Sequence, residues 1–211
     1  MVYGSAAGVG YNHGVSNINI CVILKNLDFS VLKQNAALVK SVRRQNIAVP
    51  LFLTKEYILN ALDVFPIEFS EIKEQHKVIY GEDLFKDLDI PLKDVRLLCE
   101  QQVKGKLLHL RQAYLASVTP FDLKHYLASA LNDLIPVFRQ LIIIKGQKPC
   151  EEKEGLLRQL AGIFALDEDP LLHVYHNSTR KVPQKVRFLF EPYFQNFLAQ
   201  LDKLSRHMDS L

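Results

Sequence analysis

Apolar positions change their spacing near residue 90, and the change predicts two kinds of structure. Before that point the apolar runs are short and lie between turn-forming residues, which is typical of strands in a small sheet. Such runs cover residues 18–24, 47–53 and 63–72, and we interpret the last as the third main strand of the sheet. Pro50 lies inside the second run, so that strand is expected at an edge or a bulge.

Helical spacing appears first over residues 29–45, where Ser30 is the expected N-cap. Thr54 is expected to cap a short helix that reaches residue 62. From residue 93 onward strand signals vanish and long helices are expected. These cover residues 93–117, 120–145 with a kink at Pro136, 151–166, 170–176 and 183–210. Long helices with short connections predict an antiparallel bundle.

The predicted fold class is therefore α+β, with a domain boundary at Pro91. Residues 1–90 are expected to form a small mixed β-sheet domain with helices. Residues 91–211 are expected to form an all-α helical bundle domain, and a cleft between two domains is a common place for a ligand.

Composition narrows the class of protein. The chain has 211 residues, of which 48% are hydrophobic and 23% charged, as in an ordinary globular protein. Its net charge of +3 gives no strong electrostatic case for nucleic acid. No apolar run approaches the roughly 20 residues of a membrane span, and no secretory signal is visible. Three widely spaced cysteines, Cys21, Cys99 and Cys150, indicate reduced thiols in a cytoplasmic protein.

Candidate chemistry lies at the N-terminus, where Gly4 and Ser5 follow a short apolar start and precede a loop rich in glycine. Small residues at such a turn let a phosphate group approach the backbone, because no Cβ stands in the way. Ser5 adds a hydroxyl group and an N–H as hydrogen-bond donors. The next strand opens with Ser16, Asn17, Ile18 and Asn19.

This arrangement resembles the DNA polymerase β-like nucleotidyltransferase superfamily. In that family Gly-Ser is followed, after a spacer, by an Asp-x-Asp pair that holds two divalent metal ions against a nucleoside triphosphate. The resemblance implies that Gly4, Ser5 and Ser16 bind the nucleotide, and that Asn17 and Asn19 stand at the metal positions. A second likeness, to a bacterial branch with a helical C-terminal half, rests on the stretches Phe-Pro-Ile-Glu-Phe at 65–69 and Tyr-Gly-Glu-Asp at 80–83.

Asn17 and Asn19 change the expected chemistry, because Mg²⁺ prefers charged oxygens and an amide offers only a neutral one. Two dications about 4 Å apart repel each other unless carboxylates offset their charge. We therefore expect a degenerate two-metal site in a protein that binds a nucleotide or regulates, with little or no transferase activity. The alternative is an active enzyme that uses Mg²⁺ and ATP, or another NTP, to move a nucleoside monophosphate onto a small-molecule or protein hydroxyl. A scaffold without a ligand is the third interpretation.

Two further residues take roles from the resemblance. Glu68, in the predicted third strand, is the candidate third carboxylate, although it could equally lie on the solvent face. Lys106, with Lys104, His109 and Arg111 on the first long helix, could meet a triphosphate or could be an ordinary surface lysine. Because only three residues precede Gly4, a weak sheet edge is expected, and a homodimer is one way to cover it.

Overall fold

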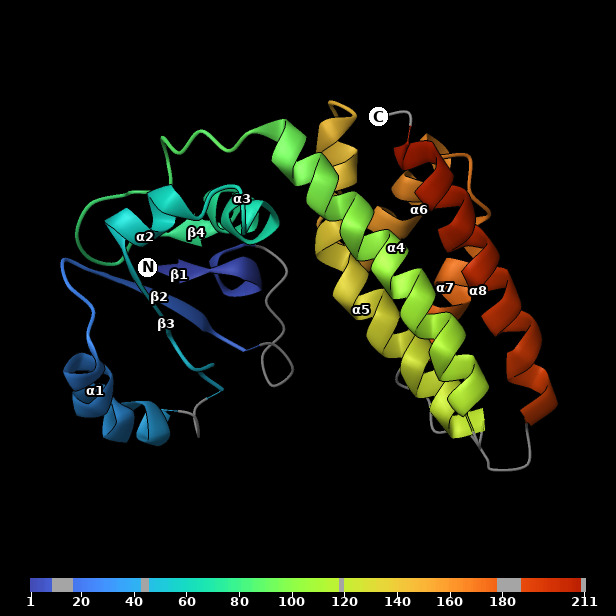
Figure 1. Ribbon diagram of the computed structural model, residues 1–211, viewed down its shortest axis with the longest axis horizontal. Helices are drawn as coiled ribbons and strands as arrows, with labels where there is room; N and C mark the ends of the chain where they lie inside the picture. Colours follow the sequence, from blue (N-terminus) through green and yellow to red (C-terminus); the bar gives the residue numbers. More distant parts are fainter. Residues whose placement is uncertain (9–16, 43–45, 118–119, 178–186, 210–211) are drawn as a thin grey trace. The chain divides into compact units, whose positions relative to one another are not determined.

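A computed structural model of the chain describes residues 1–8, 17–42, 46–117, 120–177 and 187–209. The fold is α+β, and the chain divides into two compact units, Met1–Asp94 and Val95–Leu211. The N-terminal unit contains a small sheet with short helices, and the C-terminal unit is helical (Figure 1). Each unit is described by itself below.

The sheet of the N-terminal unit is mixed, with strand order β3-β2-β1-β4. Its strands are β1 (Val2–Tyr3), β2 (Asn19–Leu24), β3 (Leu51–Thr54) and β4 (His76–Lys77). β1 pairs antiparallel with β2 on one side and with β4 on the other, whereas β2 and β3 run parallel. The prediction of a strand at residues 18–24 is thus confirmed, and β3 begins directly after Pro50, which cannot donate to a ladder.

Helices lie on both sides of this sheet (Figure 1). α2 (Lys55–Asn60) and α3 (Pro66–Glu74) cover the face that carries the core, whereas α1 (Phe29–Val42) lies on the other side. The core is one apolar cluster, formed by Cys21, Leu53, Ile58, Ala61, Phe69, Ile72, Phe85 and Leu88. Over residues 29–41 no side chain of α1 is buried, so this helix contributes little to the core.

The expected third main strand at residues 63–72 is wrong, because these residues belong mostly to α3. Pro66 occupies the first turn of that helix, where its fixed φ and missing N–H are tolerated. Ile67, Phe69 and Ile72 are buried, which fits the helical repeat better than strict alternation does. Glu68 therefore lies on a helix, and its side chain is exposed.

The two predicted helix caps have different outcomes. Thr54 caps α2 as expected, since its hydroxyl oxygen accepts a hydrogen bond of 3.1 Å from the Tyr57 N–H. Ser30 is not the cap of α1. Asp28 takes that role, with a carboxylate oxygen 3.1 Å from the Val31 nitrogen and 2.6 Å from the Ser30 hydroxyl. A carboxylate at this position also suits the positive end of the helix dipole.

The C-terminal unit is a helical bundle, as predicted. Its described helices are α4 (Leu92–Ala116, which begins just before the unit boundary), α5 (Pro120–Ile144), α6 (Lys153–Ile163), α7 (Glu168–Asn177) and α8 (Arg187–Met208). Gly146, with φ of +73°, follows the end of α5, where a left-handed residue is usual. Cys99 contacts Val137, whereas Lys106, later in α4, contacts Asp133, earlier in α5. α4 and α5 are therefore antiparallel.

α5 is the most apolar helix of the bundle. Its stretch Asp122–Ile144 would be long and apolar enough to cross a membrane, judged by length and composition alone. However, 56% of that stretch is buried, and α5 contacts α6, α7 and α8. These apolar residues therefore form the centre of the bundle, together with Phe194, Phe197, Leu201 and Leu204 from α8.

Burial in this bundle gives a stability prediction. Phe197 is fully buried, with 0% of its surface exposed. Phe197→Ala should lower the free energy of unfolding by about 3–5 kcal/mol, because it leaves a cavity. Leu115→Ala is the matched control: Leu115 is 84% exposed, and its loss should cost within about 0.5 kcal/mol. Urea denaturation followed by circular dichroism measures both values. Equal losses in the two variants would contradict the placement of α8 in the core.

Candidate functional site

The Gly4–Ser5 turn directly follows β1. Gly4 has φ of +71°, a left-handed backbone conformation that residues with a Cβ rarely adopt. Its N–H donates a hydrogen bond of 2.8 Å to the Gln75 carbonyl at the end of α3. Residues Gly4–Ala7 then form one short turn of 3-10 helix. The chain therefore turns sharply at the position where the sequence predicted a phosphate-binding turn.

Asn19 lies beside this turn, as the resemblance implies. It pairs with Tyr3 in the β1–β2 ladder, so the start of β2 meets the end of β1. A Cβ placed on Gly4 would lie 3.2 Å from the Asn19 side-chain nitrogen, Nδ2. The structure thus brings Gly4 and Asn19 together. Asn17 is exposed just before β2, and Ser16 lies outside the described residues.

Glu68 is not brought to this turn by any contact among the described residues. It lies in the first turn of α3, whereas Gln75, which bonds Gly4, follows the last turn. Gln75 is seven positions after Glu68, which is about 10 Å along the helix axis. The third strand along the chain, β3, has the sequence Leu-Phe-Leu-Thr and carries no acid.

These donors do not fit a two-metal centre. Asn17 and Asn19 offer neutral oxygens, and the only carboxylate assigned to the site, Glu68, lies at the far end of α3. Among the residues that the structure describes, no group of three or more His, Cys, Asp or Glu side chains could hold a metal ion.

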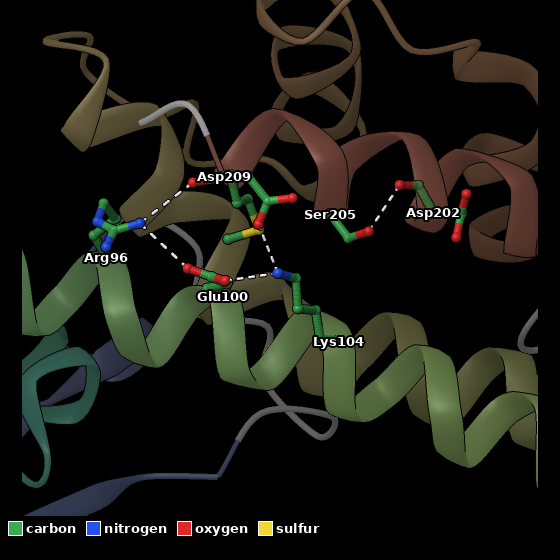
Figure 2. Close-up of polar contacts among 7 residues, drawn as sticks. Arg96, Glu100, Lys104, Asp202, Ser205 and Asp209 are labelled. Carbon is green, nitrogen blue, oxygen red and sulfur yellow. Dashed lines mark hydrogen bonds and ion pairs between the residues drawn. The ribbon is translucent and has the colours of Figure 1, made fainter.

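Arg96, Lys104, Lys106 and Arg111 of α4 have carboxylate partners inside the helical unit. Lys106 Nζ lies 2.8 Å from Asp133 Oδ2, and Arg111 pairs with Asp202 at 3.2 Å. Figure 2 shows Lys104 between Glu100 and Asp209, at 2.7 and 2.6 Å, beside the contacts of Arg96 with Glu100 and with α8. These pairs join α4 to α5 and α8. A nucleotide-binding role for Lys106 stays a prediction, and it would require Lys106 to leave Asp133.

His173 and His176 are three positions apart on α7, but their side chains contact different groups. His176 Nε2 lies 2.9 Å from Glu154 Oε2, whereas the His173 ring stacks on Tyr193 with 3.4 Å between ring centroids. Burial, and secondarily the charge of His176, lowers the pKa of His173. Both histidines therefore have structural contacts.

Sequence reasoning missed a groove at the opposite end of β1 from Gly4. It has a volume of about 780 Å³, and Met1, Ile23 and Tyr80 are among its lining residues. Leu24, at the carboxyl end of β2, and Lys55, just after β3, also line it. Ligands of α/β proteins often bind outside the carboxyl ends of parallel strands. No motif pointed to this groove, because its lining comes from four separate stretches of the chain.

A second missed feature is the contact between His76 and Asp83. His76 Nε2 lies 3.0 Å from Asp83 Oδ1, and the histidine side chain is only 10% exposed. In the sequence Asp83 stood out only as part of a Tyr-Gly-Glu-Asp stretch, seven positions after His76. The predicted strand at residues 63–72 would have given His76 and Asp83 different positions. Their contact follows only from the helix α3 that the structure shows there.

Two of the three cysteines have buried thiol groups. Cys21 and Cys99 are buried and Cys150 is exposed, and all three are free. Burial raises the pKa of Cys21 to about 11 and that of Cys99 to about 12. At neutral pH both buried groups are therefore uncharged thiols, which are poor nucleophiles.

Comparison with known proteins identifies no relative. No protein-family model matches the chain, and neither the curated proteins nor the solved structures contain a significant match. The likeness to nucleotidyltransferases therefore rests on short sequence stretches alone, at residues 4–5, 16–19, 65–69 and 80–83.

The geometry of the turn gives a prediction for two glycines. Gly4→Ala should destabilise the N-terminal unit by about 1–2 kcal/mol for the left-handed conformation, and further through the 3.2 Å contact with Asn19. Gly81→Ala is the control, because Gly81 has φ of +84° but nothing within 4 Å of a Cβ. Urea denaturation should show the larger loss for Gly4→Ala. Equal losses would contradict close packing of Asn19 on the turn.

Proposed function

We propose that the N-terminal unit binds the phosphate groups of a nucleotide at the Gly4–Ser5 turn without a divalent metal ion. In this proposal the chain has a nucleotidyltransferase-like fold and acts as a nucleotide-binding or regulatory protein with little or no transferase activity. ATP is the first ligand to test, because the resemblance implies a nucleoside triphosphate.

One observation carries the proposal: the Asn19 Nδ2 atom lies beside Gly4, 3.2 Å from where a Cβ would stand. An amide nitrogen is a hydrogen-bond donor, so Asn19 can donate to a phosphate oxygen held at this turn. The Ser5 hydroxyl can donate to the same group. Hydrogen bonds to a charged acceptor are stronger than neutral ones, which favours an anion here.

The exchange of acids for amides has a definite physical consequence. Carboxylates at positions 17 and 19 would repel phosphate unless cations stood between them. Asparagines do not repel phosphate, and their amide groups can contact it directly. The same exchange removes the charges that would offset two dications, which lowers the expected rate of phosphoryl transfer.

Isothermal titration of the full chain with ATP tests this proposal. Binding should be similar with Mg²⁺ and with EDTA. Ser5→Ala should weaken it by about tenfold or more, because one hydrogen bond to a charged group is worth about 1.5–3 kcal/mol. Ser41→Ala is the matched control, since the Ser41 hydroxyl donates a hydrogen bond of 2.7 Å to the Leu38 carbonyl within α1, away from the turn. Absence of ATP binding at millimolar concentration would defeat the proposal, and tight binding that requires Mg²⁺ would defeat its metal-free part.

A repaired site makes a complementary prediction. The double substitution Asn17→Asp with Asn19→Asp should create measurable binding of Mn²⁺ or Mg²⁺ and should weaken ATP binding in EDTA, since two negative charges then face the phosphates. Titration of each variant with metal alone and with ATP alone separates the two effects. A double variant without metal affinity would show that positions 17 and 19 do not face one site.

A further inference from the structure

The groove at the start of β1 has the size and the mixed lining of a site for a small molecule. Its volume of about 780 Å³ lies within the roughly 300–1,000 Å³ that is typical of such sites. Its apolar lining includes Ile23, Leu59 and Leu84. Every lining residue belongs to the N-terminal unit, so this unit forms the groove by itself.

Two lysines come together at the strand ends that border the groove. Leu24 and Thr54 are register partners at the ends of the parallel strands β2 and β3, whose backbones lie about 5 Å apart. Lys25 and Lys55 are the next residues along the chain, and both line the groove. Two like charges at neighbouring positions favour an anionic group between them. The anionic end of a ligand is therefore expected here, at the carboxyl ends of the parallel strands.

Two carboxylates line the same groove from other parts of the chain. Glu56 lies in the first turn of α2, and Glu82 lies in the segment that follows β4. In the described part of the chain, the side chains of Lys25, Lys55, Glu56 and Glu82 have no hydrogen-bond or ion-pair partner. A purely anionic ligand would meet the two glutamates, and a purely cationic ligand would meet the two lysines. The groove therefore suits a ligand that carries both charges.

The side of the groove that carries Glu82 is held in place by its neighbours. Residues 78–90 form no helix or strand, but Phe85 is fully buried in the core cluster. Asp83 Oδ1 accepts hydrogen bonds from the Phe85 and Lys86 N–H groups at 3.2 and 3.1 Å. These contacts fix the backbone on the carboxyl side of Glu82. A ligand that binds here consequently has less chain to order, which favours binding.

Two large apolar side chains of the groove remain exposed to solvent. Tyr80 is 94% exposed and Leu59 is 49% exposed, and both line the groove. A Cβ placed on Gly81, beside Tyr80, would have nothing within 4 Å, so open space adjoins this ring. Covering exposed apolar surface is favourable, and an aromatic ring also stacks on a second ring. The part of a ligand between its two charges is therefore expected to be apolar.

We propose that this groove binds a small zwitterion with an apolar body, the chemistry of a short apolar peptide with free ends. The carboxylate of the ligand lies between Lys25 and Lys55, and its ammonium group pairs with Glu82. Its apolar side chains cover Leu59 and Tyr80. A dipeptide is the first probe, because it carries both charges and two side chains in one small molecule.

Isothermal titration of the full chain with three forms of one dipeptide tests the proposal. The forms are L-leucyl-L-phenylalanine, its N-acetyl derivative without the ammonium group, and its amide without the carboxylate. The free dipeptide should bind, and each blocked form should bind about tenfold more weakly or less, because one charge-assisted contact is lost. Absence of binding by the free dipeptide at millimolar concentration would overturn the proposal, and so would equal binding by either blocked form.

Paired variants locate the carboxylate of the ligand. Lys25→Gln with Lys55→Gln should weaken binding of the free dipeptide about tenfold or more, and should remove its preference over the amide. Both lysines are exposed, so the fold should tolerate the change. Lys33→Gln, at an exposed position of α1, is the matched control and should leave binding and preference unchanged. A double variant that still prefers the free carboxylate would contradict the assigned orientation.

Methyl NMR of the unchanged chain supplies a readout that requires no variant. On addition of the dipeptide, the methyl signals of Ile23, Leu59 and Leu84 should shift, because these side chains line the groove. Leu134, which is fully buried in α5, is the internal control and should not shift. Shifts that omit the groove would refute the site. The groove lies at the other end of β1 from the Gly4–Ser5 turn, so this outcome does not depend on ATP binding.

Discussion

The hydrogen bond from the Gly4 N–H to the Gln75 carbonyl is the contact on which the N-terminal unit depends. It joins the end of β1 to the end of α3, and it requires the left-handed conformation that Gly4 adopts. Because β1 has only two residues, its pairing with β2 and β4 would be weak without this connection. With it, Tyr3 lies opposite Asn19 on one side and opposite His76 on the other. The Gly4–Ser5 turn and the His76 contact therefore share one anchor.

The two units obtain their stability in different ways. The bundle buries large side chains such as Phe138, Phe194 and Phe197, and ion pairs such as Lys106–Asp133 join its helices. The N-terminal unit buries a smaller cluster, and α1 remains largely exposed. Local opening costs least where few apolar contacts are made, and ligand-binding segments are usually found there. The candidate chemistry at Gly4 and Asn19 accordingly lies in the less buried unit.

Sequence patterns predicted the long helices well, because apolar residues such as Leu107, Leu134 and Leu201 repeat over many turns. Residues 63–72 failed because a short segment with Val64, Phe65, Ile67 and Phe69 fits both periods. Pro66 was the signal that separates them, since proline is favoured in the first turn of a helix. β4 could not be predicted, because a two-residue strand has no pattern of its own. The Gly4–Asn19 contact was implied by resemblance, whereas the His76–Asp83 contact needed the geometry of α3.

The amides at positions 17 and 19 and the Asn19 nitrogen beside Gly4 have one explanation under the proposed function. A site that holds phosphate through metal ions needs acids, because the cations carry the attraction. A site without cations needs neutral donors instead, since acids would repel the same ligand. Asn19, whose nitrogen lies against the turn, meets the second requirement and not the first. In the proposed function, one acid at either position would face the phosphates, so amides at both positions 17 and 19 fit direct phosphate contact.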